Sequence, residues 1–118
     1  MTRRVSPEDV GDLLISPPRA SLAFVADATI QALPVSFRSH DGRYMFGVME
    51  ASDSLVPGAP VQLLIDDGDY MSELRGIAIA GRIGERREGL SDSSITWFEL
   101  LASLITAWDY SAMRRKQP

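Results

Sequence analysis

Hydrophobic side chains alternate with polar or small ones in three successive stretches of the chain. A period of two places every second residue on one face of an extended segment, and it predicts strands at Ser21–Val25, Leu33–Phe37 and Arg43–Val48. Asp41-Gly42 separates the last two stretches, and this dipeptide suits a tight hairpin turn that requires positive φ at both central residues. The connection at Asp27-Ala28-Thr29 has no glycine and is a weaker turn signal. The pattern therefore predicts consecutive antiparallel strands.

The second half of the chain continues the strand pattern. The predicted segments are a loop at Met49–Pro60, strands at Val61–Ile65 and Leu74–Ile83, and a polar loop at Gly84–Ser94. The last apolar segment, Ile95–Trp108, has an interior that could form a helix. Its β-branched and aromatic residues favour two strands, or one strand bent around Ala102-Ser103.

One short helix is predicted before the first strand. Ser6 can cap it, Pro7 suits its first position, and it must end before Pro17-Pro18 because the residue preceding a proline is pushed out of the helical region. We expect this helix to plug one end of a barrel. The fold class is mainly β, a small antiparallel split β-barrel with one or two short helices, in one domain spanning residues 1–118.

The amino-acid composition excludes several kinds of functional site. The 118 residues include no cysteine and only one histidine, which excludes disulfides, cysteine nucleophiles and histidine-rich metal sites. The net charge of −4 argues against broad electrostatic binding of nucleic acid. No segment reaches the roughly twenty apolar residues that a membrane helix needs. With no signal peptide visible, we expect a cytoplasmic protein without nucleic-acid or membrane partners.

Few residues suggest chemistry on their own. The acidic run Asp66, Asp67 and Asp69 lacks the further ligands of a calcium loop and is interpreted as a solvated turn. His40 stands beside a tight turn, which is a poor platform for a hydrolase triad. Arg75 shares a strand face with Ile77 and Ile79, so its guanidinium requires a phosphate or a carboxylate partner, unless it extends to solvent. Glu73 or an aspartate is the alternative to a phosphate.

Two segments carry a resemblance to a known family: LPVSFRSHDGRYMFGV, residues 33–48, and ELRGIAIAGRI, residues 73–83. They resemble the FMN-binding split barrels, which are related to pyridoxamine 5'-phosphate oxidase and to actinobacterial deazaflavin-dependent reductases. The resemblance implies a homodimer with flavin sites at the subunit interface, acting on a small-molecule substrate. The expected cofactor is FMN, with a deazaflavin as the alternative.

The resemblance also suggests contacts to the cofactor. Arg38, Ser39 and His40 end the second strand, which flanks the flavin in that family, although they could simply be the polar approach to a hairpin. Ser52 keeps a hydroxyl in the phosphate-binding stretch. Trp108, like Trp97 and Tyr110, could stack on a planar ring or supply buried area at a barrel end or dimer seam. The candidate cofactor-binding residues are Arg38, Ser39, His40, Ser52, Arg75 and Trp108, and no catalytic or metal-binding residue is assigned.

The chain departs from the family in the stretch after Val48. It has no lysine or arginine there, and Glu50 and Asp53 would repel a phosphate dianion. Two hypotheses follow: an FMN- or deazaflavin-dependent oxidoreductase, or a split barrel that has lost its flavin and serves as a binding or dimerisation module. A homodimer is also expected because the faces of the predicted strands offer more apolar surface than one small barrel interior should need. The residues on these faces are Val35, Phe37, Phe46, Val48, Ile77 and Ile79.

Overall fold

The computed structural model describes residues 4–49, 53–67, 75–87 and 94–110. Its elements run in the order β1 (Arg4–Val5), the 3-10 helix η1 (Pro7–Val10), α1 (Asp12–Ile15), β2 (Arg19–Ala26), β3 (Thr29–His40), β4 (Arg43–Val48), β5 (Pro60–Asp67), β6 (Arg75–Arg87) and β7 (Thr96–Asp109). None of the described helices is long and apolar enough to cross a bilayer.

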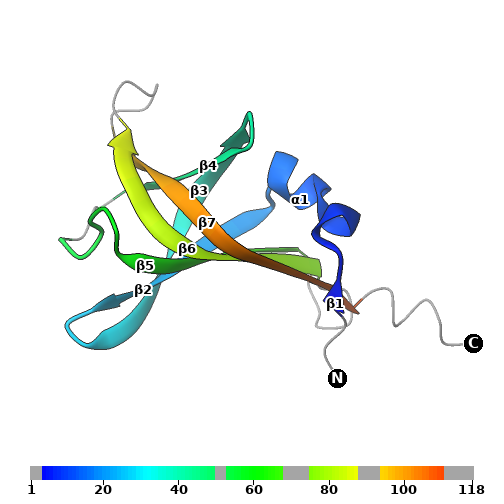
Figure 1. Cartoon of the computed structure of the whole chain (residues 1–118), viewed down its shortest axis with the longest axis horizontal. Helices are drawn as coiled ribbons and strands as arrows, with labels where there is room; N and C mark the ends of the chain where they lie inside the picture. The colour runs from blue at the N-terminus through cyan, green and yellow to red at the C-terminus, as the bar shows by residue number, and fades with distance from the viewer. Residues whose placement is uncertain (1–3, 50–52, 68–74, 88–93, 111–118) are drawn as a thin grey trace, which may run out of the picture.

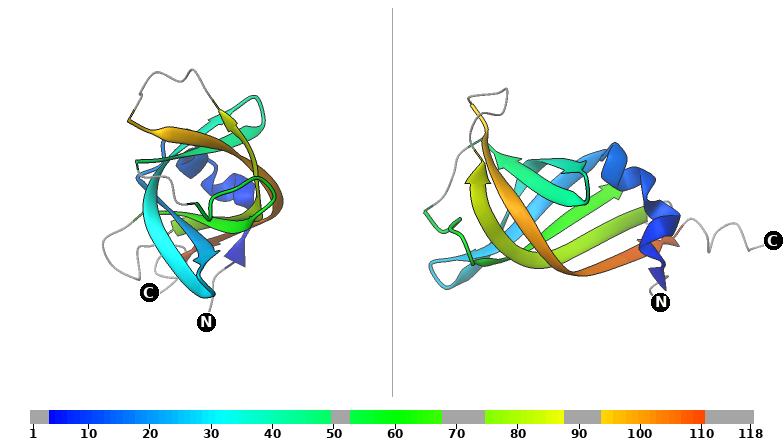
Figure 2. Two further views of the ribbon diagram at one scale, coloured as in Figure 1. Left: turned by 90° about the vertical axis from the view of Figure 1, so that its left-hand side faces the viewer. Right: turned by 45° about the horizontal axis from the view of Figure 1, so that its top comes forward.

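The strands form one antiparallel barrel (Figure 1). Its neighbours run β7-β4-β3-β2-β5-β6, and β6 pairs back with β7, so the sheet closes on itself. The short β1 adds to β7 at the other side, where Arg4 faces Trp108. The curved strands wrap around a central axis with the helical segment at one end (Figure 2). The predicted fold class, a mainly β antiparallel barrel with little helix, is confirmed.

Both early hairpins turn through two residues with positive φ. The values are 53° and 61° at Asp27 and Ala28, and 51° and 75° at Asp41 and Gly42. The second hairpin was predicted from its Asp-Gly pair and is confirmed. The first is equally tight although it has no glycine. As a result β3 begins at Thr29, whereas the alternation alone had predicted a start at Leu33.

The last two strands are longer than the hydrophobic pattern indicated. β6 continues to Arg87, where Arg86 and Arg87 pair with Phe98 and Trp97, so the prediction of a loop from Gly84 is wrong. β7 is one strand, as the β-favouring residues indicated. Its register shifts beside Ser103, whose hydroxyl donates a 3.0 Å hydrogen bond to the carbonyl of Ala80. This irregularity lies at the bend predicted around Ala102-Ser103.

The barrel interior is filled by buried apolar side chains from β2 to β7, and Val5 of β1 packs against them. The rings of Phe46 and Phe98 stack with centroids 5.4 Å apart, and the most deeply buried residues include Leu22, Leu63, Ile65, Ile77 and Ile79. Phe37, Phe46, Val48, Ile77 and Ile79, which were expected to supply surplus surface for a dimer, are buried within one chain. That argument for a homodimer was therefore wrong.

The N-terminal segment closes one end of the barrel through Val10 and Leu13, which are fully buried. Instead of a single helix it forms η1 and α1, with Gly11 between them. Ser6 makes no side-chain cap, because its hydroxyl bonds to the carboxylate of Glu8. α1 ends before Pro17-Pro18, as predicted.

Candidate functional site

A groove runs across the outside of β3 at the point where β4 ends. One part, of about 460 Å³, is lined by Leu33, Pro34, Val35, Ser36, Gly47 and Met49. A second part, of about 330 Å³, shares Leu33 and Pro34 and is otherwise lined by Arg19, Ala20, Ser21, Ala32, Leu64 and Asp66. Both volumes fall in the range of small-molecule sites, roughly 300–1,000 Å³. We call the two parts together the β3 groove.

Arg38 is held near the first part of the β3 groove by stacking on Trp97. Its guanidinium carbon lies 4.8 Å from the centroid of the indole ring. Trp97 packs against Gly47, which lines the groove, because a Cβ at Gly47 would lie only 2.9 Å from the ring and 2.5 Å from Ile95. Arg38 forms no ion pair with any carboxylate in the described part of the chain. The stack therefore presents an exposed, positioned cation next to the groove.

Arg19 and Asp66 form an ion pair within the second part of the β3 groove. The side chain of Arg19 is 56% exposed, and that of Asp66 is 26% exposed. They face each other because Arg19 and Asp66 are register partners in the pairing of β2 with β5. This end of the groove offers one charge of each sign, in contrast to the positive charge of Arg38.

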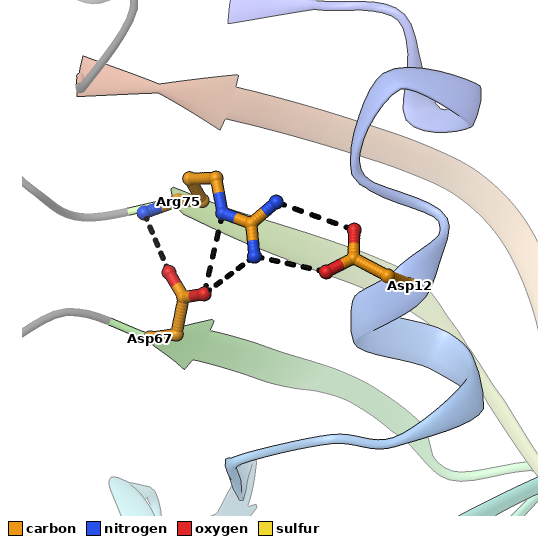
Figure 3. A network of polar contacts seen from close by, with 3 residues as sticks. All are labelled: Asp12, Asp67 and Arg75. Carbon is orange, nitrogen blue, oxygen red and sulfur yellow. Dashed lines mark hydrogen bonds and ion pairs between the residues drawn. The ribbon is translucent and has the colours of Figure 1, made fainter.

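Arg75 lies at the start of β6 between two carboxylates (Figure 3). Its Nη2 donates to Asp67 at 2.7 Å and to Asp12 at 2.9 Å. A second bond to each carboxylate runs from Nε to Asp67 and from Nη1 to Asp12. These bonds raise the pKa of Arg75 and lower the pKa of the Asp12 carboxyl. The partner that the half-buried guanidinium needed is thus a pair of aspartates, and a phosphate would have to displace one of them.

The other predicted contacts do not gather around the β3 groove. The hydroxyl of Ser39 donates to the carbonyl of Leu14 at 3.1 Å, and His40 lies exposed at a hairpin tip with Nε2 3.1 Å from an oxygen of Asp41. Trp108 packs over Gly76 beside Arg75, since a Cβ on Gly76 would lie 2.2 Å from the ring. Ser52 lies outside the described residues. Of the five predicted residues that the structure describes, Arg38 is the one that lies by the groove.

Titratable side chains do not cluster into a metal centre within the described ranges. No group of three or more His, Asp or Glu side chains there could hold a metal ion. Asp66 and Asp67 point to different partners, Arg19 and Arg75.

The comparisons with known proteins identify the fold. No family model and no curated protein matches the chain. Among solved structures, the FAD-binding protein from Mycobacterium smegmatis is 20% identical, with a TM-score of 0.68 over 88% of this chain and 96% of that one. The FAD- and heme-binding protein from the same organism is 16% identical, with a TM-score of 0.70 over 91% and 73%. A provisionally assigned pyridoxamine 5'-phosphate oxidase from Corynebacterium glutamicum is 11% identical, with a TM-score of 0.68 over 91% and 96%. The chain is a split barrel.

Two features of the split barrel's groove were missed from the sequence. Arg19 was not singled out, because its place opposite Asp66 depends on the pairing of β2 with β5. Trp97 was considered as a stacking aromatic or as buried area at a barrel end or dimer seam; it is 3% exposed, and its contact with Arg38 was not predicted. Gly47 carried the available signal, since a glycine within a strand marks a close approach of another group.

Proposed function

We propose that this split barrel binds a flavin nucleotide in the β3 groove and functions as an FMN- or deazaflavin-dependent oxidoreductase. The observation that carries the proposal is the positioned, exposed guanidinium of Arg38 next to a groove of suitable volume. Arg38 would bind the phosphate by charge-assisted hydrogen bonds, and the Ser36 hydroxyl and the apolar groove residues would orient the remainder. The likeness to flavin-binding structures supports this choice among small-molecule ligands.

The residues of the groove fit binding better than acid–base chemistry. The bound flavin would itself supply the hydride or electron transfer, so the protein need only bind, orient and exclude water. In this proposal the protein is a homodimer in which the second copy covers the flavin, and the substrate is a small molecule that approaches the same groove. Exposed apolar side chains on β2, β3 and β7, namely Val25, Ile30 and Leu104, are available for such an interface.

The test is a fluorescence titration with FMN of two matched variants. Arg38→Gln removes the charge while leaving a side chain long enough to cover Trp97, and Arg43→Gln removes an exposed charge on the neighbouring strand. Because bonds to a charged group contribute about 1.5–3 kcal/mol, Arg38→Gln should weaken FMN binding about tenfold or more. Arg43→Gln should change it by less than about threefold, in the range of an exposed charge. Equal affinities for the two variants would exclude Arg38 as the phosphate ligand.

The alternative is a split barrel that has lost its flavin and serves as a binding or dimerisation module. The exposed carboxyl of Asp53, in the stretch expected to meet the phosphate, favours this second function. An absorption spectrum and a native mass spectrum of freshly purified protein distinguish the two. Protein that carries no flavin and binds none of FMN, FAD or a deazaflavin would support the module.

A further inference from the structure

The barrel is open along part of one strand edge. β3 pairs with β2 from Thr29 to Val35, but on its other side it pairs with β4 only from Ser36 to His40. Among the described strands, none pairs with the second edge of Thr29–Val35. This half of β3 belongs to the hairpin that projects at the lower left of Figure 1.

The turn decides which backbone groups face the open edge. In a two-residue hairpin the flanking pair, here Ala26 and Thr29, exchanges hydrogen bonds, and the direction of the groups then alternates along the strand. The N–H and C=O groups of Gln31 and Leu33 therefore face β2, and those of Ile30 and Ala32 face away. Pro34 falls on the outward set, where its missing N–H costs no bond to β2.

The open edge lacks most of the features that protect such edges from pairing. Residues Thr29–Val35 contain no charged side chain and form no bulge in their pairing with β2, and Ile30 is 79% exposed. The neighbouring Val25, the register partner of Ile30, is 54% exposed on the same face. An uncharged, flat strand with exposed apolar side chains is a template for another strand.

We propose that Ile30–Pro34 pairs with the same segment of a second copy, antiparallel and around a twofold axis near Gln31 or Ala32. The segment is self-complementary, because in either register each outward N–H of one copy faces an outward C=O of the other. Because the segment has no charged side chain, its pairing places no like charges opposite each other at the junction. Ile30 of each copy gains an apolar neighbour, Ala32 or Pro34 of the other copy, across the new junction.

This pairing would also complete the candidate site. Leu33 and Pro34 line both parts of the β3 groove, so a strand added beside them becomes a further wall of that groove. The inference concerns the surface through which two copies meet, and it does not depend on whether a flavin binds.

Residue-resolved hydrogen exchange of the wild-type protein tests the pairing. Ile30 and Ala32 amides should exchange at least about tenfold more slowly at high protein concentration, near 1 mM, than near 10 µM, as a dimer forms. Gln31 and Leu33 amides, bonded to β2, serve as internal controls and should be protected at both concentrations. Light scattering under the same conditions reports the mass.

Two proline changes give opposite expectations. Ala32→Pro removes an outward N–H without removing a bond to β2 and should give a monomer, and Pro34→Ala restores an outward N–H and should keep or tighten the dimer. If Ala32→Pro does not fold, Ala32→Lys tests the same edge by placing like charges near each other across the junction. A dimer in which the Ile30 and Ala32 amides remain unprotected would overturn the inference, as would a monomer at 1 mM. Protection of these amides where light scattering reports a monomer would overturn it as well. Flavin titration is a separate measurement, so either proposal can fail alone.

Discussion

In each of the two early hairpins the chain turns through residues with positive φ, and these residues differ in how well they tolerate that angle. Ala28 and Gly42 occupy equivalent turn positions, with φ of 61° and 75°. Glycine adopts such angles without steric conflict, whereas an alanine there places its Cβ close to a carbonyl oxygen. The first hairpin therefore stores strain that the second does not.

Replacing the strained alanine should stabilise the protein. We expect Ala28→Gly to raise the free energy of unfolding by about 0.5–1 kcal/mol, the relieved strain being offset in part by the greater freedom of glycine in the unfolded chain. Gly42→Ala is the matched control and should lower it by about 1 kcal/mol, through backbone strain alone because no atom lies within 4 Å of the added Cβ. Urea denaturation measures both. A loss of stability in Ala28→Gly would contradict the strain described at this turn.

Gly47 matters for a different reason, the space it leaves for Trp97. Gly47→Ala should destabilise the fold by about 1–3 kcal/mol, because the methyl group would overlap Ile95 and the indole ring. The emission of Trp97 should shift as its ring moves. Gly84→Ala, whose closest contacts at 3.2 Å are milder, should cost less in the same denaturation experiment. Similar losses for the two variants would show that the packing of Trp97 on Gly47 is unimportant.

At the scale of elements, α1 is joined to the strands by polar contacts as well as by its buried Leu13. Asp12 binds Arg75 at the start of β6, and the carbonyl of Leu14 accepts a bond from Ser39 on β3. The contacts fix a short segment that would not be helical on its own. Their strength should depend on pH through the carboxyl of Asp12.

Asp12→Asn should lower stability at neutral pH and lose its effect in acid. Binding to Arg75 lowers the pKa of Asp12 below its ordinary value of 3.8, so its contribution is present above that pH and disappears as the pH falls through the lower, folded-state value. Asp12 is 63% exposed, so we expect under about 1 kcal/mol at pH 7. Asp9→Asn, the same change of charge on η1, is the control. Denaturation at a series of pH values should show the two variants converging in acid, and a difference that persists unchanged at the lowest pH would contradict the ion pair.

The strand pattern was predictable where it depended on local sequence. The alternation of apolar residues located β2, β4 and β5, and the β-favouring residues located β7 with its bend. What could not be predicted depends on partners distant in the chain. β6 reaches Arg87 because β7 supplies partners for its last residues, and β1 exists because β7 supplies an edge. Two-residue segments such as β1 contain too little sequence pattern to detect.

The candidate site, too, could be predicted only where it did not depend on residues distant in the chain. Arg38 was identified through its place at the end of a strand, but its support on Trp97 joins two segments about sixty residues apart in the sequence. Arg75 required a partner because it lay among apolar residues, and this requirement was predictable. The identity of Asp12 and Asp67 followed only from the fold.

The charge distribution of the whole molecule affects any phosphorylated ligand. With a net charge of −4 and an exposed Asp53, the protein should bind FMN more weakly than Arg38 alone would allow. If the residues after Val48 border the phosphate, Asp53→Lys should tighten binding about tenfold, because it removes a repulsion and adds an attraction, each worth roughly 0.5–1 kcal/mol. The gain should shrink as salt is added. Asp27→Lys, the same change at the hairpin turn, is the control, and equal gains in both variants would show only a general effect of net charge.

The place of β7 in the sheet has a consequence for the synthesis of the chain. Three strands pair with β7, namely β1, β4 and β6, yet it is the last of the described strands to leave the ribosome. Until residues 96–109 emerge, β4 and β6 each present an unpaired edge, and the barrel cannot close. Pairings between distant segments also form slowly. The nascent chain therefore passes through an interval in which two open edges can join to neighbouring chains, and we expect it to depend most on chaperones during that interval.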